Sequence, residues 1–182
     1  MFRSRVWHRL ATGLLALSCW AVGTERAMAQ QADEQSVKAG FIYNFIRFTQ
    51  WVGVPDSENK RLLICATSDK PLSGQLGRLS GRTVGSRAIE VRNNVGTGDW
   101  SGCDVLFVAQ SEADRLDSYL RSLGNAPVLT VGDFAGFTKA GGMIGLRMQD
   151  NRVKFDVNLT SAQRANLQLN SQMLKLAGEV LK

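Results

Sequence analysis

The chain has 182 residues, of which 22 are Lys or Arg and 16 are Asp or Glu, so its formal net charge is +6. Its one histidine is His8, and Ser-His-Asp triads, Cys-His pairs and imidazole-ligated zinc or haem sites are therefore excluded from the chain beyond that residue. No run of Lys or Arg follows the N-terminal leader, so the basic footprint of a nucleic-acid partner is absent from the sequence.

Residues 1–29 have the pattern of a secretory signal peptide. Arginines precede the apolar run Leu10–Val22, and Ala27 and Ala29 then form an A-x-A site. We expect cleavage after Ala29, because the apolar run of 13 residues is shorter than the roughly 20 that span a bilayer. An uncleaved signal anchor is the alternative. Cleavage would remove four arginines and one glutamate, which lowers the net charge from +6 to +3.

The remaining segment, residues 30–182, is long enough for one domain with its own core. It keeps two of the three cysteines, Cys65 and Cys103. An even pair in an exported protein indicates a disulfide, and this one would close a loop of 39 residues worth about 3 to 4 kcal/mol. A structural disulfide, a reducible regulatory disulfide and two free buried thiols are all compatible with the sequence.

The first element predicted after the leader is a helix over residues 36–51, with Ser36 as its N-cap. Asn44 and Arg47 interrupt its apolar run, and the segment is too short to favour membrane insertion. Apolar residues recur at helical spacing and are expected to face the core. They are Val37, Phe41, Phe45 and Phe48, and Ile42, Ile46 and Trp51 widen the same stripe.

A repeating β-α-β order follows. Short, almost continuous apolar runs predict buried parallel strands. Leucines at helical spacing after the first run, and a Ser111 N-cap with Gly124 at the far end, predict the helices between them. The order predicts an α/β single-domain sandwich with a mainly parallel mixed sheet and flanking helices. The predicted strands are residues 61–67, 87–93, 103–110 and 126–133, and the predicted helices lie within residues 71–84 and 111–124.

The strand positions constrain the disulfide. Cys65 lies late in its predicted strand, whereas Cys103 begins its own, so simple parallel register would offset the two by several residues. A bond then requires a twist or an intervening strand that brings the Cα atoms within about 7 Å.

The C-terminal part of the chain has a different pattern. Residues 141–149 and 152–159 predict an antiparallel hairpin with a tight turn around Asp150 and Asn151. The last 23 residues, 160–182, predict one long amphipathic helix, because leucines recur there every seven residues.

The sequence offers few residues for chemistry. The stretch 136–142 has the G-x-x-x-x-G spacing of a phosphate loop but lacks the Lys and Ser/Thr that should follow, so we expect neither nucleotide nor any other cofactor there. Asp133 ends a predicted strand at the edge where open α/β sheets bind ligands, although a capping or turn role also explains it. We expect no catalytic residues and no metal site.

Several stretches together resemble the YfiR family. They are "VKAGFIYNFIRFTQW", "LLICATSDKPLSGQL", "CDVLFVAQSE" and the long segment from "VLTVGDFAGFTKAGGMIGLRMQ" to "NLTSAQRANLQLNSQMLKLA". The resemblance covers nearly all of residues 30–182. One departure is that the family usually has proline directly after the helix's tryptophan, whereas here Val52 follows Trp51.

The resemblance implies a periplasmic α/β protein without known catalysis. It implies repression of an inner-membrane diguanylate cyclase through that enzyme's periplasmic sensor domain, which would control cyclic-di-GMP signalling in biofilm formation and motility. It also implies sequestration by an OmpA-like outer-membrane lipoprotein, homodimer formation and a response to envelope or redox state. By the same resemblance, Cys65 and Cys103 match the family's cysteine pair.

Five residues form the candidate partner or ligand surface. An indole combines an apolar body with a hydrogen-bond donor, and a guanidinium is a planar fork, so both are typical interface anchors. The alternative function is a periplasmic small-molecule-sensing domain that binds a small aromatic or anionic metabolite at the strand ends. The candidate residues are Tyr43, Asn44, Arg47, Trp51 and, for the alternative function, Asp133.

Overall fold

The computed structural model describes the backbone of residues 21–54, 61–68 and 71–182, and the side chains in these ranges from residue 33 onward. The chain divides into two units, Met1–Glu34 and Gln35–Lys182, and the description below concerns the second. Most of the predicted signal peptide lies outside the described residues, so its cleavage stays a prediction. Within the described ranges, no helix combines the length and the hydropathy of a membrane span.

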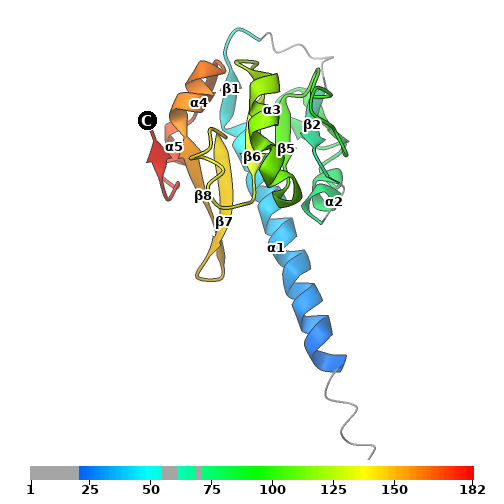
Figure 1. Ribbon diagram of the computed structural model, residues 1–182. Helices are drawn as coiled ribbons and strands as arrows, with labels where there is room; N and C mark the ends of the chain where they lie inside the picture. Colours follow the sequence, from blue (N-terminus) through cyan, green and yellow to red (C-terminus); the bar gives the residue numbers. More distant parts are fainter. Residues whose placement is uncertain (1–20, 55–60, 69–70) are drawn as a thin grey trace, which may run out of the picture. The chain divides into compact units, whose positions relative to one another are not determined.

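One eight-stranded sheet forms the centre of the domain (Figure 1). Pairings among the central strands are parallel, and those at β7–β8 and β3–β4 are antiparallel. The predicted α/β class with a mainly parallel mixed sheet is confirmed. In spatial order the strands are β10 (Val180–Leu181), β8 (Arg152–Asn158), β7 (Ile144–Gln149), β6 (Leu129–Gly132), β5 (Val105–Val108), β2 (Leu62–Ala66), β4 (Arg87–Arg92) and β3 (Thr83–Val84).

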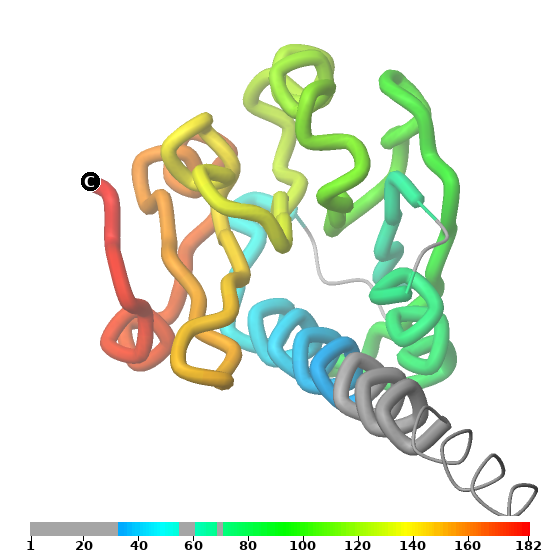
Figure 2. Tube along the Cα trace, turned by 60° about the horizontal axis from the view of Figure 1, so that its bottom comes forward, coloured from blue at the N-terminus to red at the C-terminus, as the bar shows by residue number. Residues whose placement is uncertain are grey.

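Helices cover both faces of this sheet. Along β2, Ile64 lies in a core cluster with helices α1 (Ala21–Arg47) and α2 (Leu72–Gly77), while the next residue, Cys65, lies in a second cluster with α3 (Leu116–Leu123). Figure 2 shows α3 on one side of the strands and α1 with α2 on the other. Because both faces are covered, β2 is apolar throughout, which explains why its sequence predicted a buried strand.

The helix α1 buries the centre of the predicted stripe but not its two ends. Ile42 and Phe45 are 0% and 1% exposed, and Phe41 is half-buried against the same cluster. Val37 and Phe48, however, are 41% and 37% exposed, so the prediction was wrong at both ends of the stripe. The helical repeat of 3.6 residues makes successive steps of four drift around the axis, so the two ends of the stripe leave the buried face.

Both predicted ends of this helix were also wrong. The helix begins at Ala21, so Ser36 lies inside it and is not its N-cap. It ends at Arg47, and the chain continues as strand β1 (Thr49–Trp51). At this junction the carbonyl of Phe45 accepts a 2.7 Å hydrogen bond from the Thr49 hydroxyl and a 3.2 Å bond from the backbone N–H of Phe48, which satisfies an acceptor at the helix end.

The long helix predicted over residues 160–182 is wrong. The chain forms α4 (Leu159–Arg164), β9 (Leu167–Leu169), α5 (Ser171–Leu174) and β10 instead. Two asparagines interrupt the helical pattern. Asn166 adopts a positive φ of 55°, and the side chain of Asn170 caps α5 by accepting a 2.8 Å hydrogen bond from the backbone N–H of Gln172. Leu167 and Leu169 belong to β9 instead of a helix, and β9 pairs antiparallel with β1.

One predicted turn and two predicted helix ends can also be compared with the structure. Asp150 and Asn151 have φ values of 50° and 58°, as a type I′ hairpin turn requires, so the hairpin prediction is confirmed. Ser111 is not a helix N-cap, because a 3-10 helix, η1 (Gln110–Arg115), precedes α3. Gly124 ends α3 with a φ of 55°, as predicted for a glycine at that place.

Cys65 and Cys103 form a disulfide with a Cα–Cα distance of 5.9 Å. In the β2–β5 register Cys65 lies opposite Leu106, so the predicted offset is real. A turn before β5 closes the gap: Gly102 has a φ of 79°, and the backbone N–H of Cys103 donates to the carbonyl of Trp100 at 2.9 Å. The alternative of two free thiols is wrong, and the bond is buried in the second cluster.

Candidate functional site

A pocket of about 370 Å³ lies where α1 ends. It opens at the amino end of the sheet, because it includes the first residues of β2 and β4, together with β1 and the short turn after β3. Its lining mixes apolar side chains with two guanidinium groups, an amide and an indole. The lining residues are Ile46, Arg47, Thr49, Gln50, Trp51, Val54, Leu62, Val84, Gly85 and Arg87.

Local structure brings Arg47 and Trp51 into this pocket. Arg47 is the last residue of α1, and the change from helix to strand at Thr49 places Trp51 in β1. The pairing of β1 with β9 holds that strand, with Trp51 opposite Leu167. Two of the five candidate residues therefore line one cavity, although the sequence had predicted them on a continuous helix.

The second arginine of the pocket belongs to a buried ion pair that sequence reasoning missed. Arg87 Nη2 lies 2.6 Å from Asp104 Oδ2, and the two side chains are 8% and 6% exposed. Asp104 also accepts from the backbone N–H of Leu63 at 2.8 Å, and Arg87 donates to the carbonyl of Arg61 at 2.9 Å. These bonds offset the desolvation of both charges, so Arg87 brings little net charge to the pocket.

A signal for this pair is present in the sequence. Asp104 stands directly before a continuous apolar strand, and Arg87 begins another strand. A carboxylate in such a place must be paired if it is buried, but the identity of its partner depends on strand order, which no spacing along the chain reveals.

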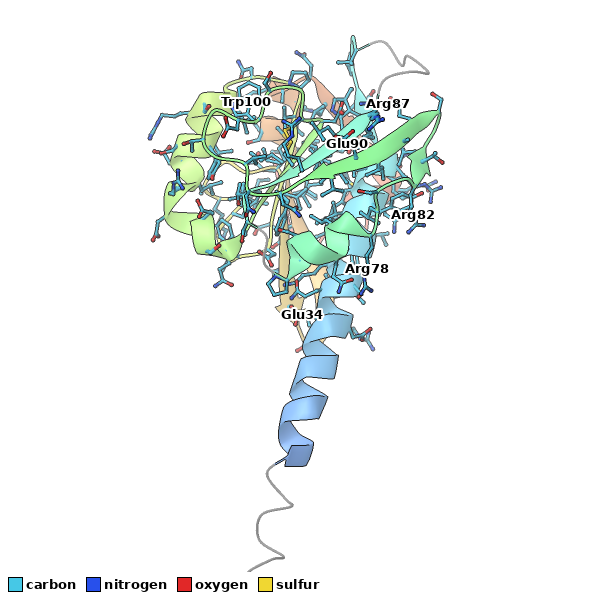
Figure 3. All side chains as sticks on the ribbon, turned by 90° about the vertical axis from the view of Figure 1, so that its right-hand side faces the viewer. Glu34, Arg78, Arg82, Arg87, Glu90 and Trp100 are labelled. Carbon is cyan, nitrogen blue, oxygen red and sulfur yellow. A yellow bond between two sulfur atoms is a disulfide. The ribbon has the colours of Figure 1, made fainter. Side chains whose placement is uncertain are left out.

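Arg47 and Arg82, the two cations beside Tyr43, differ from Arg87 in their pairing. The guanidinium carbons of Arg47 and Arg82 lie 5.9 Å and 4.3 Å from the Tyr43 ring centroid, so they are at most about 10 Å apart. Neither arginine forms an ion pair in the part of the chain that the structure describes. The Tyr43 hydroxyl donates to the carbonyl of Thr83 at 3.1 Å, which ties α1 to β3. Figure 3 labels Arg82, which directly precedes β3, and Arg87, the first residue of β4.

The indole of Trp51 has an unusual environment. Its Nε1 atom is buried and has no hydrogen-bond partner among the described residues. A buried donor without a partner costs about 1 to 3 kcal/mol, which most folds avoid. The aromatic ring therefore contributes both an apolar wall and an unused donor to the end of α1.

The remaining candidate residues lie elsewhere. Asn44 is exposed on α1 and does not line the pocket. Asp133 follows β6 at the opposite, carboxyl end of the strands, where its Oδ2 lies 3.4 Å from Lys38 Nζ. Lys38 precedes Arg47 by nine residues, which is about 13 Å along a helix, so Asp133 and the pocket are separate sites.

The glycine-rich stretch has a packing role. The ring of Phe137 is fully buried and lies so close to Gly132 and Gly142 that a Cβ atom at either position would overlap it. Within the described ranges no group of three His, Cys, Asp or Glu side chains is arranged to hold a metal ion.

Solved structures with a related fold are distant in sequence. A conserved domain protein from Vibrio cholerae is 10% identical with a TM-score of 0.53, over 80% of this chain and 60% of that chain. An ABC domain from Streptococcus pneumonia, solved in complex with L-Trp, is 12% identical with a TM-score of 0.50, over 69% and 56%. The present chain thus spans less than two thirds of either structure, and the likeness concerns the fold alone.

A family comparison is more specific. The DUF4154 model, described as YfiR/HmsC-like, matches residues 35–178. The matched segment begins inside α1 and contains the disulfide, the pocket and the buried Arg87–Asp104 pair. The chain therefore belongs to the YfiR/HmsC-like family.

Proposed function

We propose that this protein is a non-catalytic periplasmic regulator that binds and represses an inner-membrane diguanylate cyclase, and that an OmpA-like outer-membrane lipoprotein sequesters it. The observation that carries the proposal is the family match over residues 35–178, since regulation of a diguanylate cyclase from the periplasm is the family-level role. The signal-peptide pattern of residues 1–29 and the buried disulfide support the periplasmic location.

The surface around Tyr43 is the best candidate for the contact with the cyclase. Arg47 and Arg82 are exposed cations without a carboxylate partner in the described chain, and a half-buried aromatic ring lies between α1 and β3 beside them. Arginine and tyrosine are frequent anchors of protein interfaces. The partner surface should therefore be acidic, and the charges would steer and orient the encounter.

Repression requires a difference in affinity between two states of the cyclase. The protein must bind the inactive conformation of the sensor domain more tightly than the active one, because equal affinities would shift no equilibrium. Sequestration by the lipoprotein would then act by lowering the concentration of free repressor.

Cellular cyclic-di-GMP provides the test. Deleting the gene should raise the cyclic-di-GMP level, and the wild-type gene should restore it. Arg47→Glu should fail to restore it, because a reversed charge at an acidic interface costs about tenfold or more in affinity.

Arg152→Glu is the matched control. Arg152 is an exposed arginine that begins β8, far from β3 and β4 in the strand order, and we expect this variant to restore repression. An unchanged cyclic-di-GMP level in the deletion strain, with no membrane protein captured by the tagged protein, would remove the proposal. Equal failure of both variants would instead place the contact elsewhere.

A further inference from the structure

We propose that the pocket at the end of α1 binds a small organic anion, namely a carboxylate or phosphate monoester attached to an apolar body about the size of one ring. The proposed ligand is a free small molecule, so this site goes beyond the regulatory function proposed above. The site also differs from the strand-end position near Asp133 at which the sequence analysis placed its alternative ligand.

The size and lining of the pocket define the apolar part of the ligand. A volume of about 370 Å³ is at the lower end of the range for small-molecule sites, which run from about 300 to 1,000 Å³. Ile46 and Leu62 are buried core residues that form part of the wall, and Val84 adds a further apolar side chain. These residues continue the main core, so the wall is held by the packing of α1 against the sheet.

The charge balance defines the polar part. Arg87 is neutralised by Asp104 at 2.6 Å, which leaves Arg47 as the cation of the lining without a described carboxylate partner. Arg82, at most about 10 Å from Arg47, adds a second positive charge beside the pocket. A guanidinium recognises carboxylate and phosphate through two parallel hydrogen bonds, so the site should prefer an anion over its uncharged counterpart.

Trp51 supplies the aromatic part of the wall. It lines the pocket and packs partly buried against the main core cluster. The ring provides an apolar surface for the body of the ligand. The pocket thus combines a cation without a described carboxylate partner and an apolar wall at the end of one helix.

Calorimetric titration of the purified protein tests the site with defined probes. Phenylacetate and phenyl phosphate represent the two anion classes, and phenylacetamide is the uncharged counterpart of the first. We expect at least one anion to bind saturably and phenylacetamide to bind at least about tenfold more weakly, which corresponds to about 1.4 kcal/mol. The two anions together show which class the pocket prefers.

Variants locate the binding. Arg47→Gln should abolish the preference for phenylacetate over phenylacetamide, whereas Trp51→Ala, which removes the aromatic wall, should weaken the binding of both probes by about threefold to tenfold. Arg78→Gln, an exposed arginine outside the pocket, should bind as the wild type does. Circular dichroism would verify that all three variants are folded.

Three results would overturn the inference: no saturable heat with either anion, equal affinity for phenylacetate and phenylacetamide, or an Arg78→Gln loss as large as that of Arg47→Gln. The cyclase is absent from this assay. A negative titration would therefore leave the regulatory proposal intact, and an unchanged cyclic-di-GMP level on gene deletion would leave ligand binding intact.

Discussion

The two ends of the sheet carry ion pairs that differ in burial and in hydrogen bonding. At the amino end, Arg87 and Asp104 approach to 2.6 Å, and each also bonds to the backbone of β2 or the residue before it. At the carboxyl end, Lys38 and Asp133 are 3.4 Å apart, and the second carboxylate oxygen, Oδ1, is buried without a partner in the described chain. A buried polar atom without a hydrogen bond costs free energy, so the amino-end pair should stabilise the fold more than the carboxyl-end pair does.

The largest effect is expected from breaking the amino-end pair. Asp104→Ala should lower the free energy of unfolding by about 3 to 5 kcal/mol, because it leaves the Arg87 guanidinium buried without its anion. Urea denaturation measures this loss. The double variant Arg87→Leu with Asp104→Leu, which removes both charges, should recover much of the stability. A double variant less stable than Asp104→Ala would contradict this account of the pair.

The disulfide next to Asp104 should contribute an effect of similar or slightly smaller size. Replacing Cys65 and Cys103 together by Ala should cost about 3 to 4 kcal/mol, since the unfolded chain loses the closure of its loop. Reduced wild-type protein is the control and should unfold at the same urea concentration as the double variant. If instead the reduced protein is as stable as the oxidised one, the bond does not stabilise the fold.

The smallest effect is expected at the carboxyl end. Asp133→Asn should cost no more than about 1 kcal/mol, because the amide keeps the shape of the side chain and the native carboxylate is already incompletely bonded. Asp104→Asn is the matched substitution and should cost clearly more. Equal losses in the two variants, measured by the same urea titration, would show that the two ends of the sheet do not differ as described.

The central strands and the hairpin could be predicted because their signals are local. A continuous apolar run such as β2 is required by burial on both faces, and Asp150 with Asn151 suits a turn with positive φ values. The segment 160–182 could not be predicted by periodicity, because its leucines fit a helix stripe and also fit the short β9 strand. There the deciding residues were single asparagines.

The candidate site was predictable only in part. Arg47 and Trp51 were identified from their side-chain chemistry, and the structure places both in one pocket. The Arg87–Asp104 pair depends on β4 and β5 flanking β2, an order that follows from tertiary packing rather than from residue spacing. The same reason explains why Asp133, a suitable strand-end residue by sequence, is paired with Lys38.

The outermost strands of the sheet, β3 and β10, are only two residues long. β10 pairs only with Val157 and Asn158, so the first part of β8 is not covered by it. This part exposes Arg152 and Lys154, whose positive charges would repel those of a second molecule aligned along the same strand. Short edge strands and cationic side chains both disfavour the addition of a strand from another molecule to the sheet. The eight-stranded sheet is therefore poorly suited to growth by strand addition at the β10 end.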